Sequence, residues 1–365
     1  MKFVDLKAQH DELQPELNLA ISRVIEDSSF IRGPDVVEFE TRFAKAIGVK
    51  HCISCGNGTD ALYIAQKALG AGPGDEVITP SHTWISTSET ITQTGATPIF
   101  VDTEPRYFTL CPNDLVRKIT PRTKGVIVVH LYGLPANMTE IRNICDAQGL
   151  WLIEDCAQAH FAEFEGQTVG TFGDLGTFSF YPGKNLGAMG DAGAVVTNRD
   201  DLSEFVTSFA RHGGKGNHTI EGICSRMDGI QAAVLNLKLT HIDRWTEARI
   251  AAAERYDLLF EDMDNVETPE VRPGCRHVFH LYVIRIDHRD ALKAYLAEHG
   301  IPTGIHYTRA LPFYDAYKYL KHQPNDFPVS EKDAMRILSL PLHPHITEDE
   351  QAHVVDTIKG YFARA

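Results

Sequence analysis

Between residues 51 and 155, short apolar runs alternate with segments that have helical periodicity. The runs read HCISC, EVIT, TPIFVD, GVIVVH and WLIED. They lack the polar and apolar alternation of a strand with one solvated side, so both sides of each strand are expected to be buried. Strands of this kind, each followed by a helix, predict an α/β domain with a mostly parallel central sheet and helices on both faces.

The remaining segments are less regular. Apolar residues at helical spacing predict a helix near residues 10–26 and another at 36–48. Residues 171–198 hold six glycines between short apolar pieces, which indicates a buried, shaped loop region. A long helical stretch is expected from Asp228 to about Phe260.

Beyond this stretch, the chain has the pattern of a small α/β unit. VFHLYVIRI is followed by a helix from about Asp290 and by a closing helix from Glu348 to Phe362. We therefore predict a large domain over residues 1–245 and a smaller C-terminal α/β domain over residues 246–365.

Composition narrows the classes of partner. The 365 residues are 43% hydrophobic, which suits a large buried core, and 35 Lys and Arg against 49 Asp and Glu give a net charge of -14. Since no block of basic residues could follow a phosphate backbone, nucleic acid is not expected as a partner. The start, MKFVDLKAQHDELQPEL, has no apolar run of the signal-peptide kind, and no window is long enough to span a membrane, so we expect a cytoplasmic protein with no membrane partner.

Cysteine usage agrees with that expectation. The seven cysteines are odd in number and scattered, as is typical of reduced thiols. Cys52 and Cys55 form a CxxC in an apolar run, but no second pair follows, and we interpret them as buried structural thiols.

GNGTDA, residues 56–61, follows an expected strand and opens an expected helix. The N–H groups and the dipole of a helix N-terminus favour an anion, so phosphate is the natural ligand. The letters also match the dinucleotide fingerprint G-x-G-x-x-A, which leaves an NAD-dependent dehydrogenase as an alternative. Against it, Asp75 and Glu76 stand at the start of the second strand, not after it. A plain helix cap by Asn57 or Thr59 also remains open.

Two further motifs carry an acid and a lysine. WLIEDCAQAH places Glu154 and Asp155 at the carboxyl end of a buried strand, where side chains face the ligand crevice. A nucleotide hydrolase would use such an acid for magnesium, but neither Gly-Lys pair of the chain fits its phosphate loop. SFYPGKNLGAMGDAG sets Lys184 among apolar and small residues; a lysine that bonds to an aldehyde needs such a desolvated site, because burial lowers its pKa. Taken singly, Asp155 as a helix cap and Lys184 as an exposed lysine remain open.

Together these motifs resemble the DegT/StrS family of sugar-nucleotide aminotransferases, pyridoxal-phosphate enzymes of fold type I. The similarity runs in order through FIRGPDVVEFE, NGTDAL, SHTW, HLYG, EDCAQAH, FSFYPGKNLG, SRMDGIQAAVL, IHY and PLHPHIT. It implies transfer of an amino group from glutamate to a nucleotide-linked keto-deoxysugar in amino-sugar biosynthesis. The YPGKNLGA stretch is more similar to members that aminate carbon 3, and amination of carbon 4 is the alternative. The resemblance also implies a homodimer with active sites at the subunit interface.

The resemblance implies roles for individual residues. Lys184 would bond to pyridoxal 5'-phosphate and move the proton between substrate and cofactor. Asp155 would pair with the N–H of the cofactor ring and keep the ring cationic. Gln158 would donate a hydrogen bond to the phenolic oxygen of the ring, and Trp84 would stack on the ring face.

The remaining implied contacts fall into two sets. Residues expected to hold the cofactor phosphate are Gly58, Thr59 and Ser179. Residues expected near the sugar nucleotide are Tyr181, His306 and Tyr307. No metal site is expected, because His343 and His345 have no third ligand nearby.

Two positions depart from the family pattern. Relatives commonly have Asn at the position of Cys224, where it reaches the phosphate of the neighbouring subunit, so that contact is in question here. Relatives tend to have Gly at the position of Phe161, and a phenyl ring there is expected to narrow the space beside the cofactor or to fill a void. A dehydratase of the same fold would lack Lys184, and a non-catalytic regulator would have no use for Lys184, Asp155 and Gln158 together.

Overall fold

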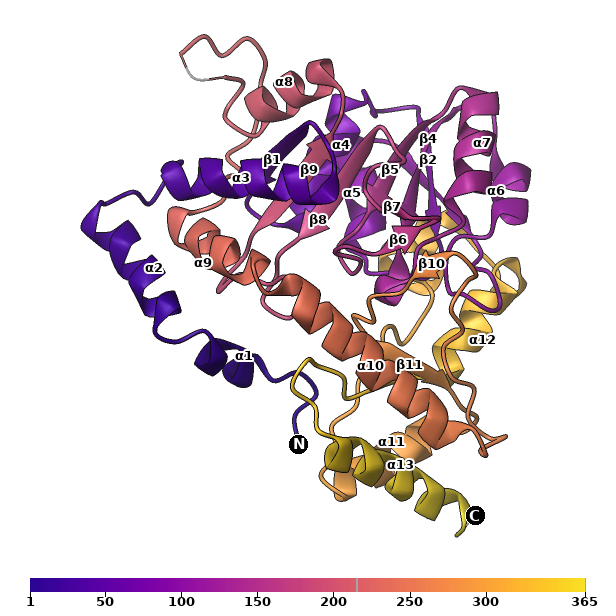
Figure 1. Cartoon of the computed structure of the whole chain (residues 1–365). Helices are drawn as coiled ribbons and strands as arrows, with labels where there is room; N and C mark the ends of the chain where they lie inside the picture. The colour runs from indigo at the N-terminus through magenta and orange to yellow at the C-terminus, as the bar shows by residue number, and fades with distance from the viewer. Residues whose placement is uncertain (215, 365) are drawn as a thin grey trace.

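The computed structural model describes residues 1–214 and 216–364 (Figure 1). Its α-helices are α1 Leu6–Glu12, α2 Glu16–Glu26, α3 Pro34–Ile47, α4 Gly58–Ala68, α5 Ser86–Thr94, α6 Pro112–Lys118, α7 Met138–Gln148, α8 Asp200–Phe209, α9 Gly229–Leu239, α10 Ile242–Phe260, α11 Arg289–Glu298, α12 Pro328–Arg336 and α13 Glu348–Phe362. Its strands are β1 His51–Cys55, β2 Glu76–Pro80, β3 Thr97–Val101, β4 Thr123–Val129, β5 Trp151–Asp155, β6 Glu163–Phe164, β7 Gln167–Thr168, β8 Leu175–Ser179, β9 Gly193–Thr197, β10 Cys275–Arg276, β11 Tyr282–Arg285 and β12 Ile337–Leu340.

A seven-stranded sheet in the order β1-β9-β8-β5-β4-β2-β3 forms the centre of the molecule. Strand β9 is antiparallel to β1 and β8, and the neighbours from β8 to β3 are all parallel. The expected mostly parallel sheet is therefore confirmed, and each of the five apolar runs forms one of its strands.

Helices cover both faces of this sheet. Since successive side chains of a strand point to opposite faces, Leu152 and Ile153 of β5 enter different cores. Leu152 packs in a cluster with residues of α6 and α7, whereas Ile153 packs with α4 and α8. Along β9, Val196 packs with α3 and α9, and Val195 packs with α4 and α8. The same alternation sends Cys52 and Cys55 of β1 to opposite faces, where both are buried free thiols.

The prediction of a loop over residues 171–198 was wrong at both ends, where β8 and β9 form an antiparallel pair. Two of the glycines that suggested a loop lie in these strands, in places where a side chain would not fit. A Cβ on Gly176 would lie 2.7 Å from the Cα of Gly170, and one on Gly193 would lie 2.4 Å from the carbonyl carbon of Asn57. The loop is shorter than expected and occupies residues 180–192, between the two strands.

Two long helices of the sequence analysis are each divided. The helix expected at 10–26 is split into α1 and α2 because Pro15, which has no N–H to donate, stands between them. The stretch from Asp228 to Phe260 divides into α9 and α10 at Thr240 and His241, whose amides bond to carbonyls three residues back. The closing helix α13 has the predicted bounds and begins with a capping box between Thr347 and Glu350.

The C-terminal part contains the antiparallel pair of β11 and β12, packed with α10, α11 and α13. Helix α10 takes part in two cores, since Trp245 packs in the cluster of α3 and α9, whereas Tyr256 packs in the C-terminal cluster. The predicted domain boundary between residues 245 and 246 falls inside this helix and stays a prediction.

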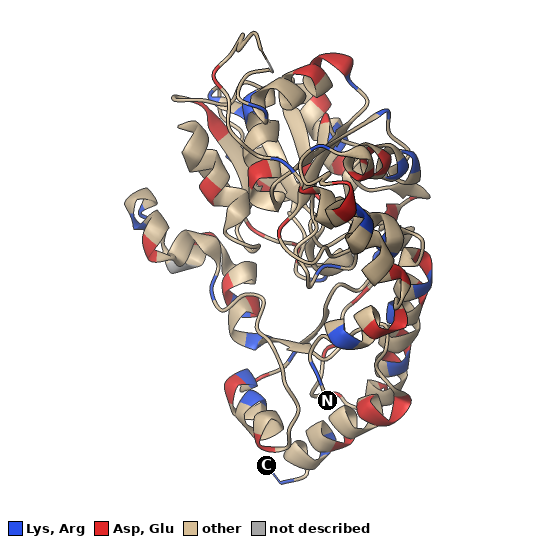
Figure 2. Cartoon of the chain, turned by 90° about the vertical axis from the view of Figure 1, so that its left-hand side faces the viewer, with Lys and Arg blue, Asp and Glu red and all other residues tan. Residues whose placement is uncertain are grey.

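Charge is mixed over the surface. In the view of Figure 2, acidic and basic residues are interspersed along the helices of both parts. Among the residues that the structure describes, no helix has both the length and the apolar character needed to cross a bilayer.

Candidate active site

A cavity of about 690 Å³ lies at the carboxyl ends of the parallel strands, where α4 and α5 begin and where the 180–192 loop crosses. Side chains of the C-terminal part also reach it, through Tyr307. All residues expected to hold the cofactor line this one cavity, namely Gly58, Thr59, Trp84, Asp155, Gln158, Ser179 and Lys184. The sequence motifs that carry them are thus brought together from four separate stretches of chain.

Asp155 ends β5 and shares the sheet face of Ile153, so its carboxylate points toward α4 and α5. The side chain is only 6% exposed. One oxygen accepts a hydrogen bond from the Thr87 hydroxyl at 3.1 Å, and the other accepts from the backbone N–H of Ala157 at 3.1 Å. Burial raises the pKa of Asp155, while the Ala157 N–H and the charge of Lys184 act in the opposite direction. These two donors fix the orientation of the carboxylate.

Lys184 lies in the 180–192 loop, which is held by its own backbone. The N–H of Lys184 donates to the Tyr181 carbonyl at 2.8 Å, and the N–H of Ala188 donates to the Phe180 carbonyl at 2.8 Å. Burial lowers the pKa of the Lys184 amine to about 8, an effect that the negative charge of Asp155 opposes. The amine can therefore exist in its neutral, nucleophilic form near neutral pH.

The N-terminus of α4 forms one corner of the cavity. The Asn57 side chain caps the helix by accepting from the N–H of Asp60 at 2.8 Å, so the cap considered for Asn57 is present. The first N–H groups of a helix have no partner within it, and Gly58 and Thr59, which carry two of them, line the cavity. A Cβ on Gly58 would lie 2.6 Å from the Cβ of Ser179, so this close approach requires glycine. Neutral donors beside a helix dipole fit a phosphate group.

Gln158 and Trp84 lie beside Tyr307. The Gln158 carbonyl accepts from the backbone N–H of Tyr132 at 2.7 Å, and its amide N–H donates to the Tyr307 hydroxyl at 3.2 Å. The Trp84 ring is 56% exposed, with its centroid 5.5 Å from that of Tyr307. A large aromatic face open to a cavity fits a planar ligand.

The three residues expected near the sugar nucleotide are not equivalent. Tyr181 and Tyr307 line the cavity, and Tyr181 is 59% exposed. His306 is not among the lining residues, and its Nδ1 lies 2.8 Å from the hydroxyl of Ser339.

Some residues that shape the site were missed from the sequence, among them His82, Thr87 and Tyr132. Each follows a strand of the central sheet, in or just after the SHTW and HLYG motifs. Their position after a strand could have identified them from the sequence, because residues that follow the carboxyl ends of parallel strands lie together at one edge of the sheet.

Glu154 faces away from Asp155, toward the opposite face of the sheet. Its carboxylate accepts from three backbone N–H groups within residues 170–173 at 2.7 to 2.8 Å and lies 3.0 Å from Nε2 of His130. Nδ1 of His130 accepts from a backbone N–H, so Nε2 carries the proton. In the part of the chain that the structure describes, Glu154, His130 and Cys156 are the one group spaced like metal ligands. The Glu154 carboxylate and both ring nitrogens of His130 are engaged in hydrogen bonds, and the Cys156 thiol donates to the Glu154 carbonyl at 3.8 Å, so we interpret the cluster as structural.

The two departures from the family pattern have different settings. Cys224 is exposed, and its sulfur accepts a hydrogen bond from the Arg226 guanidinium at 3.1 Å. Phe161 has a φ of 62°, the left-handed region that glycine prefers. Its ring packs against Phe43 at a centroid distance of 6.0 Å, in the core and away from the cavity lining. Phe161 therefore fills space in the core and does not narrow the cavity.

Comparison with known proteins agrees with this site. The sequence profile of the DegT/DnrJ/EryC1/StrS aminotransferase family matches residues 11–359. The chain is 42% identical to a pleiotropic regulatory protein of Geobacillus stearothermophilus, with 99% of this chain and 98% of the relative covered. It is 39% identical to the dTDP-3-amino-3,4,6-trideoxy-alpha-D-glucose transaminase of Streptomyces venezuelae, with 99% and 96% covered. The crystal structure of S. venezuelae DesV in complex with a ketimine intermediate superposes with a TM-score of 0.97 at 39% identity, covering 100% of this chain and 99% of that one.

The fold and the neighbours define a transaminase of the pyridoxal-phosphate-dependent class. The chain belongs to the DegT/DnrJ/EryC1/StrS aminotransferase family. Aminotransferases of this family use pyridoxal 5'-phosphate, so that is its cofactor, and the lysine, the buried carboxylate and the helix N-terminus of the cavity suit this group. The dehydrogenase and hydrolase alternatives are thereby set aside.

Proposed function

We propose that the enzyme moves an amino group from glutamate to the carbon-3 keto group of a nucleotide-linked deoxysugar, giving 2-oxoglutarate and an amino sugar. The observation that carries this proposal is the pairing, in one cavity, of a lysine amine whose pKa is lowered to about 8 with a buried carboxylate. The sugar substrate is supported by the names of relatives, which include transaminases of dTDP- and UDP-linked 3-amino sugars.

Bound pyridoxal phosphate supplies an aldehyde that exchanges oxygen for nitrogen and a ring that accepts electron density from the substrate carbon. The Lys184 amine would hold the cofactor covalently between reactions. Once displaced by the incoming amine, it would carry the proton between substrate and cofactor, and a pKa near 8 lets it both accept and donate. The Asp155 carboxylate, fixed by Thr87, would hold the proton on the ring nitrogen.

The other lining residues would bind and orient. Gly58, Thr59 and Ser179 would donate hydrogen bonds to the phosphate, Gln158 to the phenolic oxygen, and the Trp84 ring would cover one face of the cofactor. Tyr181 and Tyr307, at the same cavity, would contact the sugar nucleotide.

The direct test uses holoenzyme, glutamate and a panel of dTDP- and UDP-linked 3-keto and 4-keto sugars, with the products identified by mass spectrometry. Amination of a 3-keto sugar is the expected result. Amination of 4-keto sugars alone would move the proposal to carbon 4, and no amination of any member by cofactor-loaded enzyme would refute it.

The role of Lys184 has a separate test. Borohydride reduction of the holoenzyme, followed by peptide mapping, should leave the cofactor attached to the peptide that contains Lys184. The Lys184→Arg variant is the matched control and should carry no label. Label on another lysine of the wild-type protein would remove the basis of the assignment.

We also propose a homodimer whose partner completes the site. Among the described residues that line the cavity, Lys184 is the only Lys or Arg, beside Asp60, Asp155 and Asp191. A cofactor phosphate and a nucleotide diphosphate need more positive charge than this, which a second copy would supply. Apolar side chains exposed along α2, α3 and their connection fit such an interface: Leu19, Ile25, Phe30, Ile31 and Val37. A fully active monomer in light scattering would refute the dimer.

A cytoplasmic location is proposed as well, on the free state of all seven cysteines in the described structure. Cell fractionation with antibody detection tests it, and recovery in a secreted fraction would refute it.

A further inference from the structure

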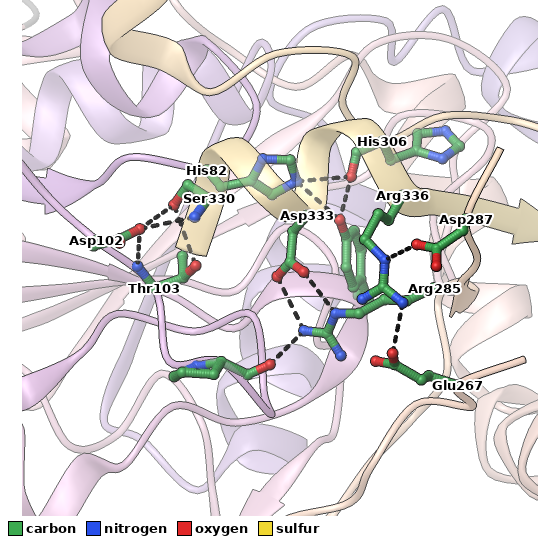
Figure 3. A network of polar contacts seen from close by, with 12 residues as sticks. His82, Asp102, Thr103, Glu267, Arg285, Asp287, His306, Ser330, Asp333 and Arg336 are labelled. Carbon is green, nitrogen blue, oxygen red and sulfur yellow. Dashed lines mark hydrogen bonds and ion pairs between the residues drawn. The ribbon is translucent and has the colours of Figure 1, made fainter. Parts of the chain in front are cut away.

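His82 is a buried histidine that the mechanism above does not use. It follows β2 in the SHTW motif, is 2% exposed and is not among the residues that line the cavity. Its imidazole lies beside the backbone of His306, which belongs to the C-terminal part (Figure 3).

The imidazole contacts one peptide group of the C-terminal part. Nε2 of His82 lies 3.2 Å from the backbone N of Tyr307, 3.2 Å from the carbonyl oxygen of His306 and 3.1 Å from the hydroxyl of Tyr132. The tautomer of the ring decides whether Nε2 accepts from the Tyr307 N–H or donates to the His306 carbonyl, and both bonds join His82 to the same peptide group. The Tyr132 hydroxyl donates to the carbonyl of His306. The His306–Tyr307 peptide is therefore bound by two side chains of the large part.

This peptide sets the place of the Tyr307 side chain. Tyr307 lines the cavity, its hydroxyl accepts from Gln158, and its ring packs beside Trp84. The ring centroids of His82 and Tyr307 are 6.1 Å apart. His82, which lies outside the cavity, is therefore linked through Tyr307 to the side chains of Gln158 and Trp84, which line the cavity.

The same segment is also held within the C-terminal part, where Nδ1 of His306 contacts the Ser339 hydroxyl of β12 at 2.8 Å. In the same part, Arg285 of β11 forms an ion pair with Asp333 of α12 at 2.7 Å (Figure 3). The side chains of His82 and Tyr132, both from the large part, therefore hold the peptide group between His306 and Tyr307.

We propose that His82 is a positioning residue that, through its hydrogen bond to the His306–Tyr307 peptide, places the Tyr307 side chain for contact with the keto-sugar. This inference rests on the proposed function. Burial lowers the pKa of His82 to about 4, so the imidazole is neutral near pH 7 and binds the peptide by a neutral hydrogen bond.

The test compares His82→Leu, which removes the hydrogen-bonding nitrogen at similar volume, with His82→Gln, whose amide can donate or accept near the position of Nε2. Losing a hydrogen bond of this kind corresponds to about a tenfold effect. For His82→Leu we expect the KM for the keto-sugar to rise about tenfold, with kcat and the KM for glutamate changed less than about threefold. His82→Gln should stay within about threefold of the wild type.

Two further measurements separate positioning from a general loss of structure. Calorimetric titration of holoenzyme with the same keto-sugar, without glutamate, should show the dissociation constant rising in parallel. In a Tyr307→Ala background, His82→Leu should add less than about twofold, because the residue through which it acts is gone.

The outcomes are distinct. An unchanged KM in His82→Leu, a fall in kcat alone that follows lost cofactor or a lower Tm, or full additivity with Tyr307→Ala would each overturn the positioning role while the proposed function stands. If cofactor-loaded wild type aminates no keto-sugar, the proposed function fails and the inference fails with it.

Discussion

Asp102 offers a stability test of how the C-terminal part is attached to the central sheet. It directly follows β3 and is 7% exposed. Its carboxylate accepts from the backbone N–H of Val329 at 2.9 Å. It also accepts from the backbone N–H of Ser330 at 2.9 Å and from the Ser330 hydroxyl at 2.6 Å (Figure 3). Helix α12 has no side-chain cap from its own N-cap residue, so Asp102 caps it from 227 residues away.

The expected cost of Asp102→Ala follows from these contacts. Loss of a helix cap costs about 0.5 to 2 kcal/mol. A buried donor left without a partner costs about 1 to 3 kcal/mol, and the Ser330 hydroxyl keeps Ser81 as a partner at 2.6 Å. Because such terms are not fully additive, we expect a loss of about 3 kcal/mol in the free energy of unfolding.

Urea unfolding followed by circular dichroism measures this loss. With an m-value of about 3 kcal/mol per M, the midpoint should fall by about 1 M. Asp315→Ala is the matched control, since Asp315 is 81% exposed and pairs only with the exposed Lys318, and it should leave the midpoint unchanged. If Asp102→Ala unfolds at the midpoint of the control, the cap does not hold α12 to the sheet and the reasoning is wrong.

Three shorter predictions concern the site and its surroundings. Burial lowers the pKa of Lys184 to about 8, so only a fraction of the amine is neutral below that pH. The rate at which the apoenzyme bonds to added pyridoxal phosphate, measured by absorbance, should therefore rise about tenfold per pH unit below pH 8 and level off above it. A flat profile between pH 6 and 8 would contradict this. In steady-state assays, Asp155→Asn should retain the cofactor but lower kcat by about 10²-fold or more. Thr87→Val, which removes one donor to Asp155, should lower kcat less than about tenfold. Equal losses of kcat in the two variants would contradict the roles given to these residues. Phe161→Gly should relieve about 1 kcal/mol of strain from the left-handed backbone conformation but remove the packing of the ring on Phe43. We expect the free energy of unfolding, measured by thermal unfolding, to fall by about 1 to 2 kcal/mol. A stabilised variant would show that the strain outweighs the packing.

Local patterns in the sequence predicted a large part of this molecule. Each apolar run became a strand of the central sheet, because continuous apolar character reports burial on both faces without knowledge of the neighbours. The same reasoning placed Asp155 at the ligand crevice, since the ends of parallel strands meet at one edge of a sheet, whereas the family resemblance placed Lys184 at the same site.

What the sequence did not predict depends on contacts between distant segments. The face to which Asp155 points follows from the pairing of β5 with β8, and its partner Thr87 lies 68 residues away. The glycines of β8 and β9 looked like loop residues because their role is to let other backbone approach, as at Gly193 beside Asn57. No local pattern reports such an approach.

Helix α10 has a mechanical consequence. Its 19 residues run as one helix from the core of the large part into the core of the C-terminal part, a length of about 28 Å. A continuous helix resists bending, and since Trp245 near its start packs with α3 and α9 while Tyr256 packs in the C-terminal core, α10 opposes any change in the angle between the two parts.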